Sequence, residues 1–360
     1  RGEDDYYLTE TEKVLLEKTC HFFKNVIAVY NVNGLTDMQI LEAYPQVKAV
    51  LFMGTAGEQA AGALSDILMG AVNPSGKLSQ TAALSYEDYP TARNMATNKD
   101  KPETIITYED RGLSAEDNGS VGFEKSPLAL YEEDIYMGYR YFDSFEKPVL
   151  YPFGFGLSYT DFEIKDFEFT VEDGQLKAGV TVKNTGETYA GKETVQLYVH
   201  APFGKLKKAY KELKAFEKTP VLQPGETTKL TLGFPLSDLA AFDEDTMSYL
   251  IEKGRYTVLI GNSSESVKAE AVLDFPEDVI VRKVTADIGM KACNKDKVRL
   301  FEAEKELPVP EADGLEKLIV LPEEVTFTSR SAAPYNFDTD PVRSTLQDVA
   351  AGKVTLEQFI

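Results

Sequence analysis

The chain has 360 residues, and 38 Lys and Arg stand against 59 Asp and Glu, which gives a formal net charge of -21. This charge disfavours nucleic acids and anionic membranes as partners, because both would be repelled. The hydrophobic content of 43% and the charged content of 27% are those of an ordinary globular protein. A chain of this length suits two domains.

The chain has too few cysteines and histidines to predict a structural zinc site or a set of disulfides. The chain has two cysteines, Cys20 and Cys293, and two histidines, His21 and His200, all far from metal-ligand spacing. We therefore expect no metal and no cofactor. Free cysteines without a visible signal peptide or membrane-spanning run favour a cytoplasmic location.

Two further patterns concern the location and the ends of the chain. Asn118-Gly-Ser120 and Asn262-Ser-Ser264 fit the N-glycosylation pattern, which requires secretion, so a secreted protein stays an alternative. The chain begins at Arg1 without a Met, and a helical pattern runs up to Ile360. We expect it to be a piece of a longer polypeptide.

The first 93 residues carry the alternation of helices and strands that is typical of an α/β domain. Thr9 and Glu12 form a capping-box pattern, and two continuous apolar runs have the character of buried parallel strands. The expected elements are a helix over 9–23, a strand over 26–30, a short crossover helix over 37–44, a strand over 49–53 and a helix over 57–69. The segment 1–93 therefore predicts part of an α/β domain with a parallel sheet.

Residues 94–160 are expected to connect two domains. The stretch 94–126 is polar and lacks periodicity, which indicates a surface excursion. The stretch 131–160 is rich in aromatic residues, and in Pro152-Phe-Gly-Phe-Gly-Leu-Ser-Tyr159 large rings alternate with glycines. This pattern favours a junction at which backbones approach closely and rings fill the remaining space.

Residues 161–276 predict a β-sandwich of about seven short strands, because alternating segments are separated by Gly, Asn and Pro turns. The clearest strands are expected over 162–169, 177–183, 193–199, 228–232 and 255–260. Residues 277–360 are expected to form a linker with an irregular tail. The predicted fold class is thus α/β plus all-β, a partial parallel-sheet domain followed by an immunoglobulin- or fibronectin III-like sandwich.

Two blocks of the sequence resemble glycoside hydrolase family 3. One is Tyr131-x-Glu133-x-Ile135-x-x-Gly138-Tyr-Arg-Tyr-Phe-Asp143, followed by Pro152-Phe-Gly-Phe-Gly-Leu-Ser-Tyr-Thr160. The other runs from Gly54 to Gly70 and continues into the turn Pro74-Ser-Gly-Lys-Leu-x-x-Thr81. In that family the first block links an α/β sandwich domain to a fibronectin type III-like sandwich. The resemblance implies a β-glucosidase-like enzyme of which this chain holds the non-barrel part.

The resemblance also implies where the catalytic groups lie. Retaining glycosidases use two carboxyl groups, and in this family the nucleophile is an Asp of a (β/α)8 barrel that these 360 residues do not contain. The tail after 277 resembles the entry to such a barrel in members with permuted domain order. Many members carry the acid/base Glu in a Gly-Glu-Gly or Gly-Glu-Asp loop before a Tyr-Leu-Thr helix start. Glu3 in Gly2-Glu3-Asp4 is the candidate, and a solvated glutamate in an acidic run is the alternative.

Other conspicuous polar residues receive structural interpretations. Lys77 is expected to brace backbone carbonyls in its turn rather than to bind phosphate, since the sequence lacks the ending of a nucleotide-binding loop. Glu133 is expected to pair with Arg140 beside the aromatic rings. Asp143 is expected to accept hydrogen bonds in a turn. No substrate-binding residue is nominated.

Three functions remain open from the sequence. The chain is part of a β-glucosidase acting on terminal β-linked sugars, a non-catalytic carbohydrate-binding or scaffolding module, or part of a glycoside phosphorylase of the same fold. A module of the second kind would favour exposed tryptophans, and the chain contains no Trp. The expected partners are a small sugar or β-glucoside and the barrel of the same polypeptide, and homo-oligomerisation is left open.

Overall fold

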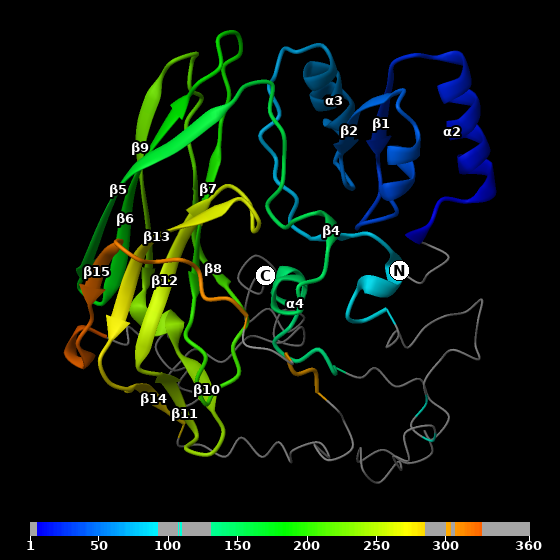
Figure 1. Ribbon diagram of the computed structural model, residues 1–360. Helices are drawn as coiled ribbons and strands as arrows, with labels where there is room; N and C mark the ends of the chain where they lie inside the picture. The colour runs from blue at the N-terminus through cyan, green and yellow to red at the C-terminus, as the bar shows by residue number, and fades with distance from the viewer. Residues whose placement is uncertain are drawn as a thin grey trace, which may run out of the picture. The chain divides into compact units, whose positions relative to one another are not determined.

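A computed structural model describes residues 6–92, 107, 109, 131–284, 300–303 and 307–325. The α/β segment comes first (Figure 1). Its main elements are helix α2 (Glu10–Phe22), strand β1 (Val26–Tyr30), the 3-10 helix η1 (Gln39–Ala43), strand β2 (Val47–Phe52) and helix α3 (Ala60–Leu68). A short 3-10 helix, η2 (Tyr86–Asp88), follows strand β3 (Ala82–Ala83).

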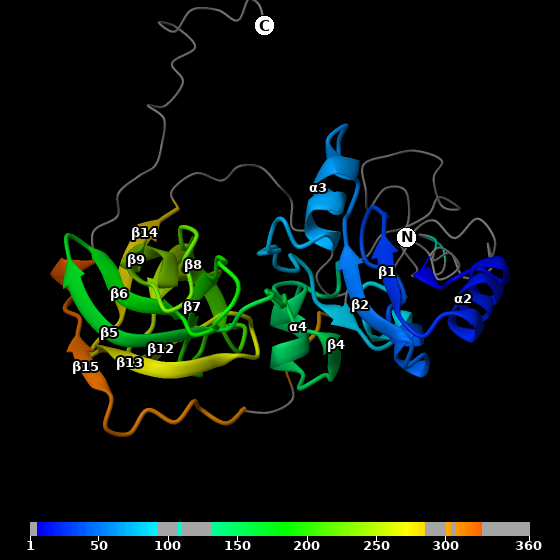
Figure 2. The same cartoon turned by 90° about the horizontal axis from the view of Figure 1, so that it is seen from above.

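The predicted start of helix α2 is confirmed at its cap. The Thr9 hydroxyl accepts from the Glu12 amide, and the Glu12 carboxylate accepts from the Thr9 amide, which completes the capping box. Strands β1 and β2 pair in parallel, as the apolar runs predict. Helix α2 lies on the β1 side of this pair and α3 on the β2 side in both views (Figures 1 and 2).

The burial of this pair differs from the prediction for two-sided parallel strands. Ile27 and Val29 of β1 are exposed, and α3 has no buried residue at all among its nine. A small core forms only on one side, around Tyr30, Met38 and Leu41. Two strands with two helices bury too little apolar surface to cover both faces of a sheet.

The junction segment contains helix α4 (Tyr139–Ser144) and strand β4 (Val149–Tyr151), which pairs antiparallel with β3. Strand β4 therefore attaches the aromatic run to the α/β segment. After residues 152–161, which hold the alternating rings and glycines, the chain enters the sandwich at β5.

The sandwich has two main layers, which are visible edge-on in Figure 2. One sheet contains β5 (Phe162–Glu172), β6 (Gln175–Asn184) and β9 (Thr227–Pro235). The other has the order β15-β13-β12-β7-β8, with β7 (Thr194–His200), β8 (Glu212–Lys218), β12 (Gly254–Gly261), β13 (Val267–Phe275) and β15 (Glu316–Ile319). A third small sheet holds β10 (Ala241–Asp243), β11 (Ser248–Ile251) and β14 (Val279–Lys283), with the 3-10 helix η6 (Leu236–Leu239) before it.

Inward-facing aliphatic side chains from both layers form the main core. Leu176 and Val180 of β6 meet Leu197 of β7, Val258 of β12 and Leu273 of β13, and each is at most 1% exposed. Alternation along each strand places these side chains on one face, which is the pattern that predicts a sandwich. Each of the five strands expected between 162 and 260 is confirmed, and most extend a few residues further.

The sandwich extends beyond the predicted boundary at residue 276. Strand β14 pairs with β11, and β15 pairs in parallel with β13 as an edge strand. Val320, next to β15, is completely buried in the main core. The prolines and acidic residues around β15 predict a linker, and only the pairing with β13 shows that this segment contains a short edge strand. The last described element is the 3-10 helix η8 (Pro322–Glu324).

Candidate functional site

The two motif blocks meet backbone to backbone at a crossing between the α/β segment and the sandwich. The Leu78 amide donates to the Phe155 carbonyl over 2.8 Å, and the Gly154 amide donates to the Leu78 carbonyl over 2.7 Å. A Cβ at Gly156 would lie 2.4 Å from the Gly76 carbonyl oxygen. Only glycine permits this approach, which explains the alternation of glycines with rings.

Asn73 fixes the same crossing through its side-chain amide. Its oxygen accepts from the Ser158 hydroxyl at 3.0 Å and from the Tyr159 amide at 2.9 Å. Its nitrogen donates to the Ala190 carbonyl in the loop before β7. One side chain thus joins the turn after α3, the aromatic run and the sandwich.

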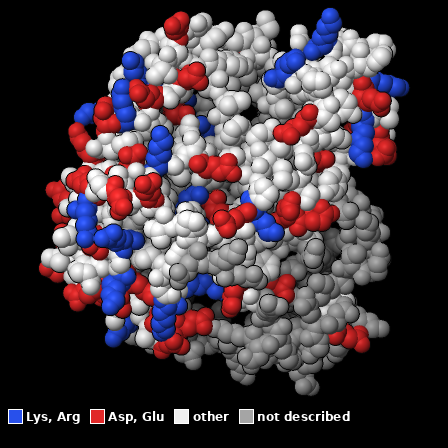
Figure 3. All heavy atoms as spheres, in the orientation of Figure 1, with Lys and Arg blue, Asp and Glu red and all other residues white. Residues whose placement is uncertain are grey.

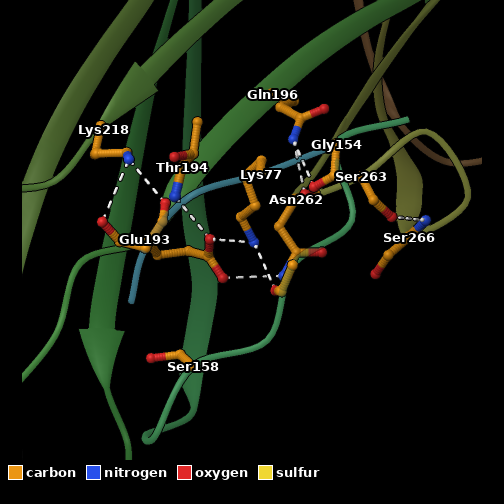
Figure 4. A network of polar contacts seen from close by, with 12 residues as sticks. Lys77, Gly154, Ser158, Glu193, Thr194, Gln196, Lys218, Asn262, Ser263 and Ser266 are labelled. Carbon is orange, nitrogen blue, oxygen red and sulfur yellow. Dashed lines mark hydrogen bonds and ion pairs between the residues drawn. The ribbon is translucent and has the colours of Figure 1, made fainter. Parts of the chain in front are cut away.

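Lys77 and Glu193 form the centre of a buried polar network (Figure 4). The Lys77 ammonium lies 2.8 Å from the Glu193 carboxylate, and their side chains are 14% and 8% exposed. Lys77 also donates to the Gly156 carbonyl, which confirms the expected role of bracing a backbone carbonyl. Glu193 accepts in addition from the Thr194 amide and the Asn262 side chain, so both carboxylate oxygens are hydrogen-bonded within the protein.

Gln196 extends this network along the face of β7 that points away from the sandwich core, since Val195 and Leu197 beside it face that core. Its side-chain nitrogen donates to the carbonyls of Gly154 and Asn262, and its oxygen accepts from the Tyr198 hydroxyl at 2.6 Å. The amide of Ser264 donates to the Phe153 carbonyl beside it. Asn262, one of the two glycosylation-type asparagines, therefore has its amide nitrogen engaged with Glu193 in the fold.

The aromatic residues of helix α4 pack this crossing against β7 and β8. Tyr139 packs against Phe153 and Tyr198, with ring centroids 4.9 and 5.8 Å away, and its hydroxyl accepts from the Leu213 amide. Burial raises the pKa of Tyr139 above its ordinary value. The hydroxyl therefore stays protonated and serves as a structural hydrogen-bonding group.

The expected pairing of Glu133 with Arg140 is wrong. Arg140 pairs with Glu212 of β8, with 3.3 Å between Nε and Oε1, while Glu133 is 2% exposed and its Oε2 has no hydrogen-bond partner. Burial by itself raises the pKa of Glu212. The positive charges of Lys214 and Arg140 have the larger combined effect, so the pKa lies below its usual range. Helix α4 begins between Glu133 and Arg140 and turns the arginine toward the sandwich.

Asp143 does not lie in a turn, which corrects the second expectation. It belongs to α4 and pairs with Lys211 at 2.9 Å, and both side chains are nearly buried. Burial raises the pKa of Asp143 although the Lys211 ammonium opposes this shift. The pair joins α4 to the start of β8, where the Tyr210 amide also donates to the hydroxyl of the helix residue Ser144.

Comparison with known proteins places these features in a family. Residues 2–159 match the model of the glycosyl hydrolase family 3 C-terminal domain, and residues 193–264 match that of the fibronectin type III-like domain. The chain belongs to glycosyl hydrolase family 3. Apart from Thr160, both motif blocks lie within the first match.

Two curated relatives of this family 3 chain are β-glucosidases. It is 31% identical to the β-glucosidase of Ruminococcus albus over 364 aligned residues, which cover 99% of this chain and 34% of that protein. It is 35% identical to β-glucosidase A of Butyrivibrio fibrisolvens over 304 residues, 78% of this chain and 33% of that protein. The family 3 chain thus spans about a third of the length of these relatives.

Solved structures of β-glucosidases share the fold. The Paenibacillus barengoltzii enzyme is 30% identical with a TM-score of 0.69, and the alignment covers 99% of this chain and 37% of that one. β-Glucosidase 3B of Thermotoga neapolitana, solved in complex with α-D-glucose, is 33% identical with a TM-score of 0.64 over 76% of this chain and 35% of that one. These likenesses support the predicted combination of an α/β segment with a β-sandwich.

The family 3 acid/base candidate, Glu3, lies outside the described residues, but the chain just after it is firmly held. The Tyr6 carbonyl accepts from the Asp37 amide and from the Thr36 hydroxyl. The Tyr7 hydroxyl donates to Glu87 and accepts from the Tyr86 amide. Tyr6 is 4% exposed and packs against Tyr7, Tyr86 and Tyr89. Burial raises the pKa of Tyr6, so its hydroxyl is neutral.

Sequence reasoning missed the sandwich side of the crossing. The pattern over 193–199 predicts an ordinary strand and does not single out Glu193 or Gln196, although a buried Gln requires a polar partner. Within the described part of the chain, no group of three His, Cys, Asp or Glu is arranged to hold a metal. In the same residues, no helix is long and apolar enough to cross a bilayer.

Proposed function

We propose that this chain is the accessory part of a retaining β-glucosidase that hydrolyses terminal β-linked sugars. The observation that carries the proposal is the match of nearly the whole chain to two β-glucosidases, of which it spans about a third. The nucleophilic Asp is assigned to a barrel outside these 360 residues. The chain itself positions the acid/base and shapes one wall of the sugar site.

The exposed apolar surface of the α/β segment supports a larger protein. Phe22 of α2 is 75% exposed, Met69 after α3 is 82% exposed, and Ile27 of β1 is 49% exposed. Among the described residues the parallel sheet has only two strands, and these exposed apolar side chains are of the kind that a soluble protein normally covers. Further polypeptide packed on β1, α2 and α3 would complete the domain.

Glu3 is proposed as the acid/base of the reaction. In the first step the barrel Asp attacks the anomeric carbon, while Glu3 donates its proton to the glycosidic oxygen that leaves. In the second step the Glu3 carboxylate takes a proton from water, which attacks the glycosyl-enzyme and releases the sugar with retained configuration. The support is its position, because Tyr6 and Tyr7 anchor the chain within a few residues of it.

The barrel is proposed to follow the tail of this chain. The alignments with the Ruminococcus albus and Paenibacillus barengoltzii proteins cover 99% of the chain, whereas that with the Thermotoga neapolitana protein covers 76%. The tail therefore has a counterpart in the first two. Strand β15 and the buried Val320 hold the beginning of this tail on the sandwich.

The proposal is tested with the parent polypeptide, which contains the barrel, and with this chain alone. The parent should hydrolyse an aryl β-glucoside and this chain should not. Glu3→Gln in the parent should lower the rate by about 10²–10⁴-fold, the usual contribution of general acid–base catalysis. External azide should restore turnover of a substrate with an activated leaving group, because the glycosyl-enzyme still forms.

The matched control is Glu10→Gln, since Glu10 lies on the exposed start of α2 and pairs only with Lys13 in the described structure. It should leave the rate unchanged. A Glu3→Gln parent with full activity would contradict the assignment of Glu3. If the parent released glucose 1-phosphate instead of glucose when phosphate is added, the reaction would be phosphorolysis and not hydrolysis.

A further inference from the structure

A cavity of about 690 Å³ lies on the fibronectin type III-like sandwich, apart from the crossing at Lys77. It is lined by the end of β7, the start of β8, the loop between them, β10 and Arg140 of helix α4. Its volume falls in the range of small-molecule sites. The network around Glu193 uses none of its lining residues.

The charges of the wall are equal in number and already paired. In a chain of net charge -21, the lining has as many basic as acidic residues. Arg140 and Lys214 pair with Glu212, Lys207 pairs with Asp134, and Lys205 pairs with both Asp243 and Asp245. Acidic and basic side chains are likewise interspersed over the described face in Figure 3.

This pairing argues against a charged ligand. To bind here, an anion would have to break the ion pair of Lys205 with Asp243 or that of Lys214 with Glu212. The carboxylate would then lack its counter-charge. A cation would leave the lysines unpaired in the same way. A fully apolar ligand would strip water from the ion pairs and return no hydrogen bonds.

A neutral ligand with many hydroxyl groups satisfies the same wall. Each hydroxyl both donates and accepts, so it can bridge a lysine and a carboxylate while their pairing persists. Among the apolar lining residues, Ala201, Leu206 and Ala241 are partly exposed and offer a surface for C–H groups. At the rim Phe242 is 39% exposed and presents a flat ring. Pyranose sugars have this combination of a hydroxylated edge and an apolar face.

The loop that frames the cavity is held in place before any ligand arrives. Both oxygens of Glu252 accept from this loop, from the Lys205 amide at 2.6 Å and the Leu206 amide at 3.2 Å, and Lys208 pairs with the same carboxylate. A Cβ at Gly204 would lie within 2.7 Å of that carboxylate, so glycine lets the loop close on it. Such preorganisation lowers the entropic cost of binding.

We propose that this cavity binds a neutral oligosaccharide. The choice of β-linked glucose as the sugar rests on the proposed function. The conclusion that the ligand is neutral and carries many hydroxyl groups rests only on the ion pairs that line the cavity. Binding there would hold an oligosaccharide on the fibronectin type III-like sandwich.

The test is calorimetric titration of the 360-residue chain with cellotetraose, with sodium sulfate as the anionic probe. Cellotetraose should bind with a Kd of about 1 mM or tighter, a modest affinity for a shallow sugar site. Phe242→Ala should weaken binding at least about fivefold, which is about 1 kcal/mol. Phe216→Ala is the control, because Phe216 is 66% exposed on β8 and does not line the cavity.

Lys205→Ala gives a second, independent variant, since this side chain is 58% exposed and its loss should leave the fold intact. It should also weaken cellotetraose binding. Absence of binding by the unaltered chain, or equal binding by the Phe242→Ala and Phe216→Ala variants, would overturn the proposal. Sulfate that competes with cellotetraose would make the cavity an anion site instead. Because no turnover is measured, a negative result leaves the β-glucosidase proposal untouched.

Discussion

The ammonium of Lys77 and the carboxylate of Glu193 lie 2.8 Å apart in the interior, one from the turn after α3 and the other from the start of β7. This pair joins the α/β segment to the sandwich. It also connects the two motif blocks, because Lys77 donates to the Gly156 carbonyl. The crossing is therefore held by polar contacts as well as by aromatic packing. Loss of the Lys77–Glu193 pair should lower the stability of the chain by a measurable amount.

Lys77→Met should lower the free energy of unfolding by about 3 kcal/mol, because it leaves the buried Glu193 carboxylate without a counter-charge. Urea unfolding of the chain measures this value. Lys165→Met is the control, since Lys165 and Glu163 form a pair that is 39% and 49% exposed. The control should change the free energy by less than about 1 kcal/mol. Equal effects of the two substitutions would contradict the central role of Lys77.

Gly156→Ala should destabilise the chain by about 1–3 kcal/mol, the usual cost of overpacking. The added Cβ would lie 2.4 Å from the Gly76 carbonyl oxygen, which is backbone and cannot swing aside. Gly179→Ala on β6 is the matched control, because its Cβ would meet only ordinary contacts from 3.6 Å. The unfolding temperatures of both variants give the comparison. A Gly156→Ala variant as stable as the control would show that the backbone at the crossing can move to accommodate the added Cβ.

His200 should make the stability of the sandwich depend on pH. The ring is completely buried, Nδ1 donates to the Tyr210 carbonyl at 2.6 Å, and Nε2 has no hydrogen-bond partner. Burial lowers the pKa of His200 below 6.5, and the nearby Lys211 adds to this effect. The unfolded chain then binds the proton more readily, so the stabilisation is full above about pH 6.5 and is lost as the pH falls toward the folded pKa.

Urea unfolding at pH 7.5 and pH 5.5 measures this dependence. His200→Asn should lose less stability than the unaltered chain between these two values, because the titrating group is gone. His21→Asn, on the exposed face of α2, should keep the original difference. A His200→Asn variant with an unchanged pH dependence would remove His200 as its source.

Phe22→Ser should behave differently in this chain and in the parent polypeptide. The side chain is 75% exposed here, so the free energy of unfolding should change by no more than about 0.5 kcal/mol. In the parent, where further chain is proposed to cover α2, the loss should approach the 1.5–3 kcal/mol of a buried aromatic side chain. A small effect in both proteins would show that this surface stays uncovered.

The sequence by itself determined the local elements and the family. The capping box of Thr9 and Glu12 placed the start of α2, and the alternation along β6 and β7 placed the sandwich strands, because both signals arise within a few residues of the chain. Only the tertiary structure decided the partners of the charged residues. Arg140 pairs with Glu212, Asp143 pairs with Lys211, and Lys77 pairs with Glu193. These choices depend on which distant segments meet and exclude water there, and no local pattern encodes that. The edge strand β15 was hidden for the same reason, since a short polar-flanked segment becomes a strand only when β13 offers its free edge.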